Sequence, residues 1–155
     1  MRKTIWIVTA ALALCGAGCA RETRQYTAEH SAQAAMASCL ATTVYYPDIQ
    51  QGLIAEDKLL PWQTHMEEYV LSYVLSQEGV AYDCVSEQGL ALLNITGFPV
   101  FDNADEERNA VMAVVNTLLE LPHVDRVALR FDGQKLIELK NGTAVNEIFE
   151  KNTGE

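Results

Sequence analysis

The sequence predicts an α+β domain in which two helices pack on one face of a small mixed β-sheet of about four to five strands, a two-layer αβ sandwich. Two amphipathic helical patterns alternate along the chain with short β-rich segments, in the order strand, helix, hairpin, helix, hairpin. The length of 155 residues suits one such domain with a tail. With 49% hydrophobic and 21% charged residues, the chain has the composition of a globular protein rather than of a disordered one.

The first β-rich segment covers residues 42–46, where β-branched and aromatic side chains continue up to the turn signal Pro47-Asp48. Residues 53–60 follow Gly52 and alternate between two sets of side chains, which predicts a short second extended segment.

The first helix is expected over residues 61–79. Thr64 and Glu67 have the spacing of a capping box, in which each side chain hydrogen-bonds an unpaired amide, and Gly79 would end the helix in a left-handed conformation. We interpret Tyr69 and Tyr73 as core residues rather than as a pair that stacks on a ligand. The stripe expected to face the core consists of Met66, Tyr69, Val70, Tyr73, Val74 and Gln77.

A hairpin is expected next, with strands at residues 80–85 and 90–95 and a turn at residues 86–89. The second of these strands is apolar on both faces, which predicts a central position in the sheet.

The second helix begins after Asn103, which has the reciprocal capping spacing with Glu106. Pro122 stops this helix, whose buried stripe would be Val111, Val114, Val115, Leu118 and Leu119. An acidic cluster at the helix start could also be a calcium site, but it lacks the glycine and ligand spacing of the usual calcium loop. We therefore interpret it as helix capping and predict no metal site; the cluster is Asp102, Asp105, Glu106 and Glu107.

The chain ends with a second hairpin. Residues 127–131 alternate like a strand, Asp132-Gly133 is a two-residue turn signal, and residues 136–139 lead to a further turn at Asn141-Gly142. Val145, Ile148 and Phe149 predict a last helical turn that closes one end of the core.

Residues 1–18 have the layout of a lipoprotein-type signal peptide, because basic residues precede an apolar run that is too short to span a bilayer. The small residues that lead to Cys19 resemble a bacterial lipobox, in which the Cys thiol is acylated, as by palmitate, and becomes the mature N-terminus. The alternative is a soluble secreted protein cut near Ala20. Residues 19–41 predict a membrane-proximal tether, which would hold the domain of residues 42–150 at the outer face of the bacterial cell membrane.

No catalytic constellation is recognisable in the sequence. His30, His65 and His123 are not spaced as metal ligands, so we predict no enzyme activity and no cofactor. The net charge of −10 argues against a nucleic-acid partner, which would need a basic patch. In an oxidising exterior Cys39 and Cys84 form a candidate disulfide pair, and two buried thiols are the equal alternative.

These segments together resemble the GerMN domain of sporulation and spore-germination proteins over roughly residues 43–149. The opening strand of that domain is similar to residues 44–48, its apolar strand to residues 90–96, and its last hairpin to Asp132-Gly133. The most similar stretch is residues 114–127, in which Asn116-Thr117-Leu118 precedes the helix end. The resemblance implies an αβ domain with a small sheet and two helices, often on a lipid anchor in spore-forming bacteria. The domain also resembles ring-building domains of envelope assemblies, and no catalytic residues are associated with the family.

The functional hypothesis is a non-enzymatic, membrane-anchored extracytoplasmic interaction domain, whose partners would be envelope or sporulation proteins or further copies of the chain. The alternative is a small-molecule-binding lipoprotein of a transport or sensing system. A deep apolar pocket with converging polar groups would favour the alternative, whereas a filled core with a flat apolar outer patch would favour assembly.

Overall fold

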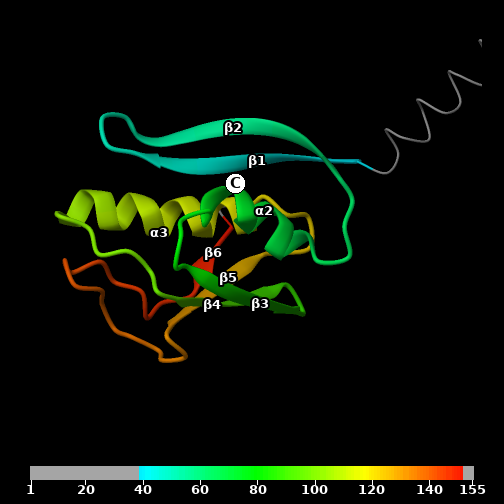
Figure 1. Ribbon diagram of the computed structural model, residues 1–155. Coiled ribbons are helices and arrows are strands. Elements are labelled where there is room, and N and C mark those ends of the chain that lie inside the picture. The colour runs from blue at the N-terminus through cyan, green and yellow to red at the C-terminus, as the bar shows by residue number, and fades with distance from the viewer. Residues whose placement is uncertain (1–38, 152–155) are drawn as a thin grey trace, which may run out of the picture. The chain divides into compact units, whose positions relative to one another are not determined.

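The structure is a computed structural model, and it describes residues 39–151. Within this range the chain forms six strands and two helices, labelled as in Figure 1. In chain order they are β1 (Cys39–Asp48), β2 (Gly52–Pro61), α2 (Met66–Val74), β3 (Ala81–Glu87), β4 (Leu90–Thr96), α3 (Ala104–Leu119), β5 (Arg126–Phe131) and β6 (Phe149–Glu150).

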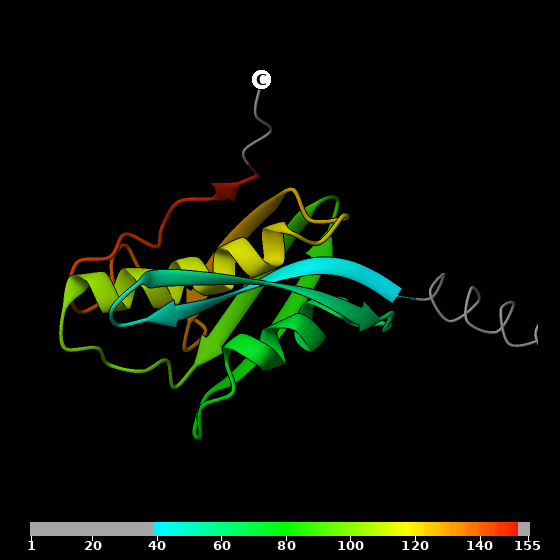
Figure 2. The ribbon, with the colours of Figure 1, turned by 90° about the horizontal axis from the view of Figure 1, so that it is seen from above.

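The helices lie between two sheets. Strands β3, β4, β5 and β6 form a four-stranded sheet in that order, whereas β1 and β2 form a separate hairpin over the other side of the helical layer (Figures 1 and 2). The pairs β3–β4 and β5–β6 are antiparallel and β4–β5 is parallel, so the four-stranded sheet is mixed. The predicted α+β class and mixed sheet are confirmed, and the opening strands add a further layer on the helices.

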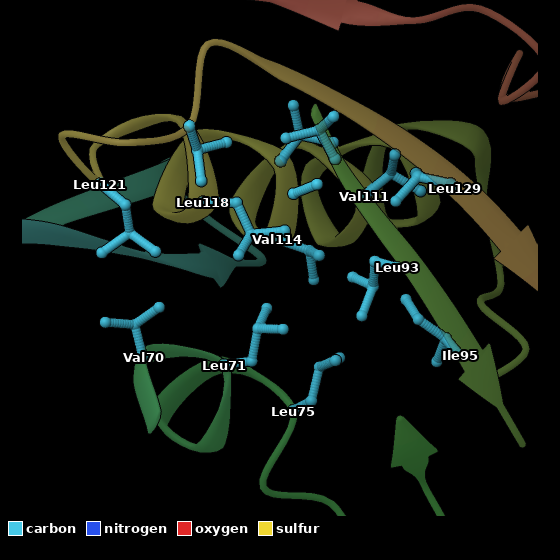
Figure 3. Close-up of a cluster of buried hydrophobic side chains, with 14 of the residues drawn as sticks. Val70, Leu71, Leu75, Leu93, Ile95, Val111, Val114, Leu118, Leu121 and Leu129 are labelled. Atoms are coloured by element: carbon cyan, nitrogen blue, oxygen red, sulfur yellow. The ribbon is translucent and has the colours of Figure 1, made fainter. Parts of the chain in front are cut away.

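The core fills the space between the helices and the four-stranded sheet. Figure 3 shows Leu71 of α2 and Val114 of α3 pointing toward Leu93 of β4 from different elements. All three side chains are almost completely buried, and burying one such side chain contributes about 1.5–3 kcal/mol. The hairpin adds Val44 and Leu60 to the buried set, because the helices carry apolar side chains on this side too.

The β3–β4 hairpin agrees with the sequence prediction. Its turn residues Gln88 and Gly89 both have positive φ, at 50° and 79°, as a two-residue turn that matches the twist of the strands requires. Strand β4 lies between β3 and β5, which confirms its predicted central position.

The first helix is shorter than predicted. Strand β2 continues to Pro61, and α2 runs only from Met66 to Val74. The predicted capping box of Thr64 and Glu67 is wrong, because the N-cap residue is His65 and no side chain caps the helix. Gly79 has the left-handed φ of 87° expected of it, but the helix ends four residues earlier, at a C-cap formed by Leu75.

The end of the chain also differs from the prediction. The Asp132-Gly133 turn is present, with both φ angles positive, but residues 134–144 form only two isolated bridges instead of a continuous return strand. The predicted helical turn around Val145 is wrong, because the chain is irregular there, with a bend at residues 146–147, and β6 then pairs antiparallel with β5. The backbone amide of Lys151 then donates to the carbonyl of Asp125 at 2.9 Å, so hydrogen bonds to β5 and its preceding turn hold β6 in place.

Candidate functional site

The predicted lipidation site Cys19 lies outside the described residues, together with His30, the signal peptide and most of the tether. Strand β1 begins at Cys39, so residues 39–41 are part of the hairpin. Within residues 39–151, none of the helices has the length and apolar character needed to cross a membrane.

The predicted disulfide partners lie in different strands. Cys39 is the first residue of β1, whereas Cys84 lies in β3 of the four-stranded sheet. No disulfide joins Cys39 to Cys84 in the described structure. Burial, with the nearby carboxylates of Glu67 and Glu68 adding to it, raises the pKa of the Cys84 thiol to about 12, so this thiol is protonated at neutral pH.

In the acidic cluster at the start of α3, only Glu107 is buried. The Asn103 side chain accepts a hydrogen bond from the Glu106 amide at 2.9 Å, which confirms the predicted N-cap. Glu107, only 2% exposed, turns inward instead and accepts hydrogen bonds from the backbone amides of Asn141 and Thr143 at 3.0–3.2 Å. The cluster therefore does not converge on a common point, and the described residues contain no group of side chains that could hold a metal ion.

One imidazole and one carboxylate meet at the surface. His123 Nε2 lies 2.8 Å from Glu67 Oε1, at a hollow of about 430 Å³ beside the half-exposed Trp62. Burial opposes the ionisation of Glu67, but the Ser86 hydroxyl, the backbone amide of Glu67 and His123 together outweigh it and lower the pKa of this carboxyl. The Ser86 hydroxyl lines the same hollow.

Glu67 of this pair is largely withdrawn from solvent, whereas its neighbour Glu68 is exposed. The Glu67 side chain is only 13% exposed, because His123 from the loop after α3 covers it. The two residues are far apart in sequence, so no local spacing could reveal their contact. A single carboxylate–imidazole pair orders the loop against α2, and it can also hydrogen-bond a polar group that enters the hollow.

The Asn116-Thr117-Leu118 stretch attaches the hairpin to α3. The backbone amide of Tyr45 in β1 donates to Thr117 Oγ1 at 2.9 Å, and Thr117 is completely buried. The Tyr45 hydroxyl donates to Glu120 Oε1 at 3.1 Å, one turn further along. The most specific part of the family resemblance therefore has a structural role, since it fixes β1 on the helix.

A second attachment joins the hairpin to α2. The ammonium group of Lys58 lies 5.7 Å from the centre of the Tyr46 ring and 5.3 Å from that of Tyr73. The same group pairs with Glu56 at 2.8 Å. Lys58 of the hairpin thus contacts Tyr73 of α2 through a cation–π interaction. The sequence pattern could not indicate this contact.

The outward side of the four-stranded sheet is not covered by a helix, and the Asp132-Gly133 turn borders it, because the Gly133 amide donates to Asn94 Oδ1 at 2.9 Å. Both helices and the β1–β2 hairpin lie on the other side (Figure 1). We call this surface the outer face; it consists of Asp83, Val85 and Glu87 of β3, Leu90, Leu92 and Asn94 of β4, and Arg126, Ala128 and Arg130 of β5. Val85 is 63% exposed, whereas the residues of β4 are half-buried by their neighbours. Val85, Leu92 and Ala128 form an apolar row across its centre.

Several solved structures share this fold. The first GerMN domain of the sporulation protein GerM from Bacillus subtilis has a TM-score of 0.61 and 19% identity, over 72% of this chain and 98% of that one. The tandem GerMN domains of the same protein have a TM-score of 0.60 and 17% identity, over 76% of this chain and 51% of that one. A candidate lipoprotein from Clostridium perfringens has a TM-score of 0.50 and 14% identity, over 75% and 90%. No match is found among curated proteins.

The fold and its open sheet face define a small α+β domain of the GerMN type. The family described as "Germane: Sporulation and spore germination" matches residues 21–137, and the chain belongs to this family. The resemblance noted in the sequence is confirmed, and the family links the chain to sporulation and germination.

Proposed function

We propose that this chain is a non-enzymatic interaction domain, anchored by lipid at the outer face of the bacterial cell membrane and used in an envelope assembly of sporulation or spore germination. The observation that carries this proposal is the family match over residues 21–137, combined with the lipoprotein-type sequence that precedes it. The fold shared with a candidate lipoprotein from Clostridium perfringens supports the anchored arrangement.

The described polar groups support an interaction role as well. Glu107 and Thr117, the two most buried polar side chains, bind backbone amides of the same chain and so serve the fold itself. The outer face, by contrast, presents charged and apolar side chains to the outside on a rigid sheet. A rigid surface of this kind suits recognition, because binding costs little ordering of the protein.

The lipid anchor is tested by replacing its acceptor. Cys19→Ala is expected to release the protein from membranes, because no acyl chain can then be attached. Cys15→Ala is the matched control, since Leu14 precedes Cys15 and the cleavage step needs a small residue there. Fractionation of cells measures both variants, and membrane retention of the Cys19→Ala variant would refute the anchor.

The interaction role is tested by chemical crosslinking on intact sporulating and germinating cells, followed by identification of the captured proteins. We expect envelope or sporulation proteins, or copies of the chain itself. Recovery of only a ligand-transport complex would instead support the small-molecule-binding alternative, for which the hollow beside Trp62 would be the first place to search.

A further inference from the structure

The outer face carries opposite charges on its two sides. Asp83 and Glu87 project from β3, and Arg126 and Arg130 project from β5, with the uncharged residues of β4 between them. The registers place Asp83, Asn94 and Arg130 in one row and Glu87, Leu90 and Arg126 in another. Two strand spacings separate the acidic from the basic column, about 10 Å, which is too far for direct ion pairs within the sheet.

These four charges are not neutralised by ion pairs inside the domain. Within residues 39–151, the ion pairs are Lys58–Glu56 and His123–Glu67. Arg126 makes one long hydrogen bond of 3.4 Å to the carbonyl of Gln88. Glu150 of β6 lies opposite Arg126 in the register but forms no ion pair with it. The basic column is therefore available to a partner, and so is the acidic one.

We propose that the outer face binds a second copy of this chain, with the two-fold axis parallel to the strands and running along β4. This rotation places β3 of one copy over β5 of the other. Each row of residues then faces the same row of the second copy. Asp83 then faces Arg130 of the second copy, and Glu87 faces Arg126. Because the contact is isologous, each pair occurs twice, and one surface supplies four opposite-charge contacts.

The charges also exclude the other simple two-fold arrangement. An axis perpendicular to the strands would place β3 over β3 and exchange the rows, so Asp83 would face Glu87 and Arg126 would face Arg130. Every charged contact would then be repulsive. The two arrangements bury the same apolar row, so the charge pattern alone selects between them.

The apolar row suits this packing. Val85, Leu92 and Ala128 lie level across the sheet, and under the proposed axis Val85 meets Ala128 while Leu92 meets Leu92. A large side chain thus faces a small one on either side of the axis, at the spacing of about 10 Å between packed sheets. Each ion pair at an exposed surface contributes little to the free energy of association, so we expect the dimer to be weak in dilute solution.

The first test exchanges the charges on the purified full chain in detergent at high concentration. One variant carries Asp83→Lys and Glu87→Lys, and another carries Arg126→Glu and Arg130→Glu. Each is expected to lose self-association by at least about tenfold, because all four contacts become repulsive. The two variants mixed together are expected to pair, since their contacts are then attractive again. A failure of the mixture to pair, with both variants folded by circular dichroism, overturns the proposal.

A matched control separates the contact from net charge. Glu78→Lys with Glu147→Lys changes the total charge by the same amount as the first variant at exposed positions off the outer face. This control is expected to associate like the wild type. Equal loss of association in the control would mean that net charge rather than the face governs dimerisation, and would overturn the proposal.

The second test locates the axis with single cysteines in chains whose native cysteines are replaced by Ser. Leu92→Cys is expected to crosslink to itself with a short bismaleimide, because it lies on the axis. Val85→Cys is expected to link to chains carrying Ala128→Cys and not to itself. Self-linking of Val85→Cys would place the axis across the strands, and absence of Leu92→Cys linking would remove the interface; either result overturns the proposal. Val100→Cys, 67% exposed and outside the sheet, measures random collision.

These tests use neither the lipid anchor nor other envelope proteins. The dimer can therefore fail while the proposed function stands, and the anchor can fail while the dimer stands.

Discussion

Glu107 provides the sharpest test of how the C-terminal segment is held. Its carboxylate accepts the Asn141 amide through both oxygens, at 3.1 and 3.0 Å, and the Thr143 amide through one, at 3.2 Å. The Asn141 side chain in turn donates to the carbonyl of Phe101 at 2.9 Å. The start of α3 and residues 141–143 are thus joined by one buried group.

We expect Glu107→Ala to destabilise the protein by about 3–5 kcal/mol. A hydrogen bond to a charged group contributes about 1.5–3 kcal/mol, and Glu107 binds two separate amides. Solvent can reach part of this loop and lowers the sum, because Gly142 between the two amides is exposed. Glu107→Gln keeps the shape and one acceptor oxygen, so about half of the loss is expected.

Chemical denaturation measures the free energy of unfolding of each variant, and hydrogen exchange reports the amides of Asn141 and Thr143. Asp105→Ala is the matched control, because Asp105 lies in the same helical turn and has the same interaction with the helix dipole, but it is exposed. If Asp105→Ala lowers the free energy of unfolding as much as Glu107→Ala does, the loss comes from the interaction with the helix dipole and not from amide binding. Unchanged exchange at both amides would refute the reasoning directly.

Three further predictions concern other contacts. Thr117→Val is expected to lower the free energy of unfolding by about 1–3 kcal/mol and to speed hydrogen exchange at the Tyr45 amide, because this amide loses its acceptor. Thr117→Ser keeps the hydroxyl and should leave both the stability and the exchange rate unchanged. Cys84 is expected to resist alkylation at pH 8 and to react fully in denaturant, as mass spectrometry of its peptide would show; fast labelling of the folded protein would contradict a pKa of about 12. The pKa of Glu67 is lowered from 4.5, so its ionised form stabilises the fold above pH 4.5 and this contribution is lost as the pH falls through the folded-state pKa. Glu67→Gln should therefore weaken the acid dependence of the free energy of unfolding; an unchanged dependence would exclude this carboxyl as a source.

The sequence predicted structure correctly where the pattern lies within a single helix or turn. The N-cap at Asn103 and the stripe of α3 follow from local spacing, and so does the turn at Gln88-Gly89, whose glycine accepts a positive φ. Local spacing failed where tertiary contacts decide. The residues around Thr64 match a capping box, but the helix begins at Met66 with His65 as its N-cap, and no side chain caps it.

The parts of the surface that sequence reasoning missed have the same origin. The Glu67–His123 and Tyr45–Thr117 contacts join positions 56 and 72 residues apart, so no periodicity reports them. The sign pattern of the outer face was equally hidden, because Asp83 and Arg130 come into one row, with Asn94 between them, only when β4 pairs with both β3 and β5. The family resemblance could predict the order of the strands. The positions of the charges relative to one another follow only from the strand registers.

The placement of the hairpin has a mechanical consequence. Strand β1 is the first described element of the chain, and its hairpin is attached to the helices by the buried side chains of Val44 and Leu60 and by two polar contacts, Tyr45–Thr117 and Lys58–Tyr73. A pulling force applied through the N-terminal segment would therefore load these contacts before it reached the four-stranded sheet. Under tension the hairpin would peel away first, while the sheet that carries the outer face would keep its shape.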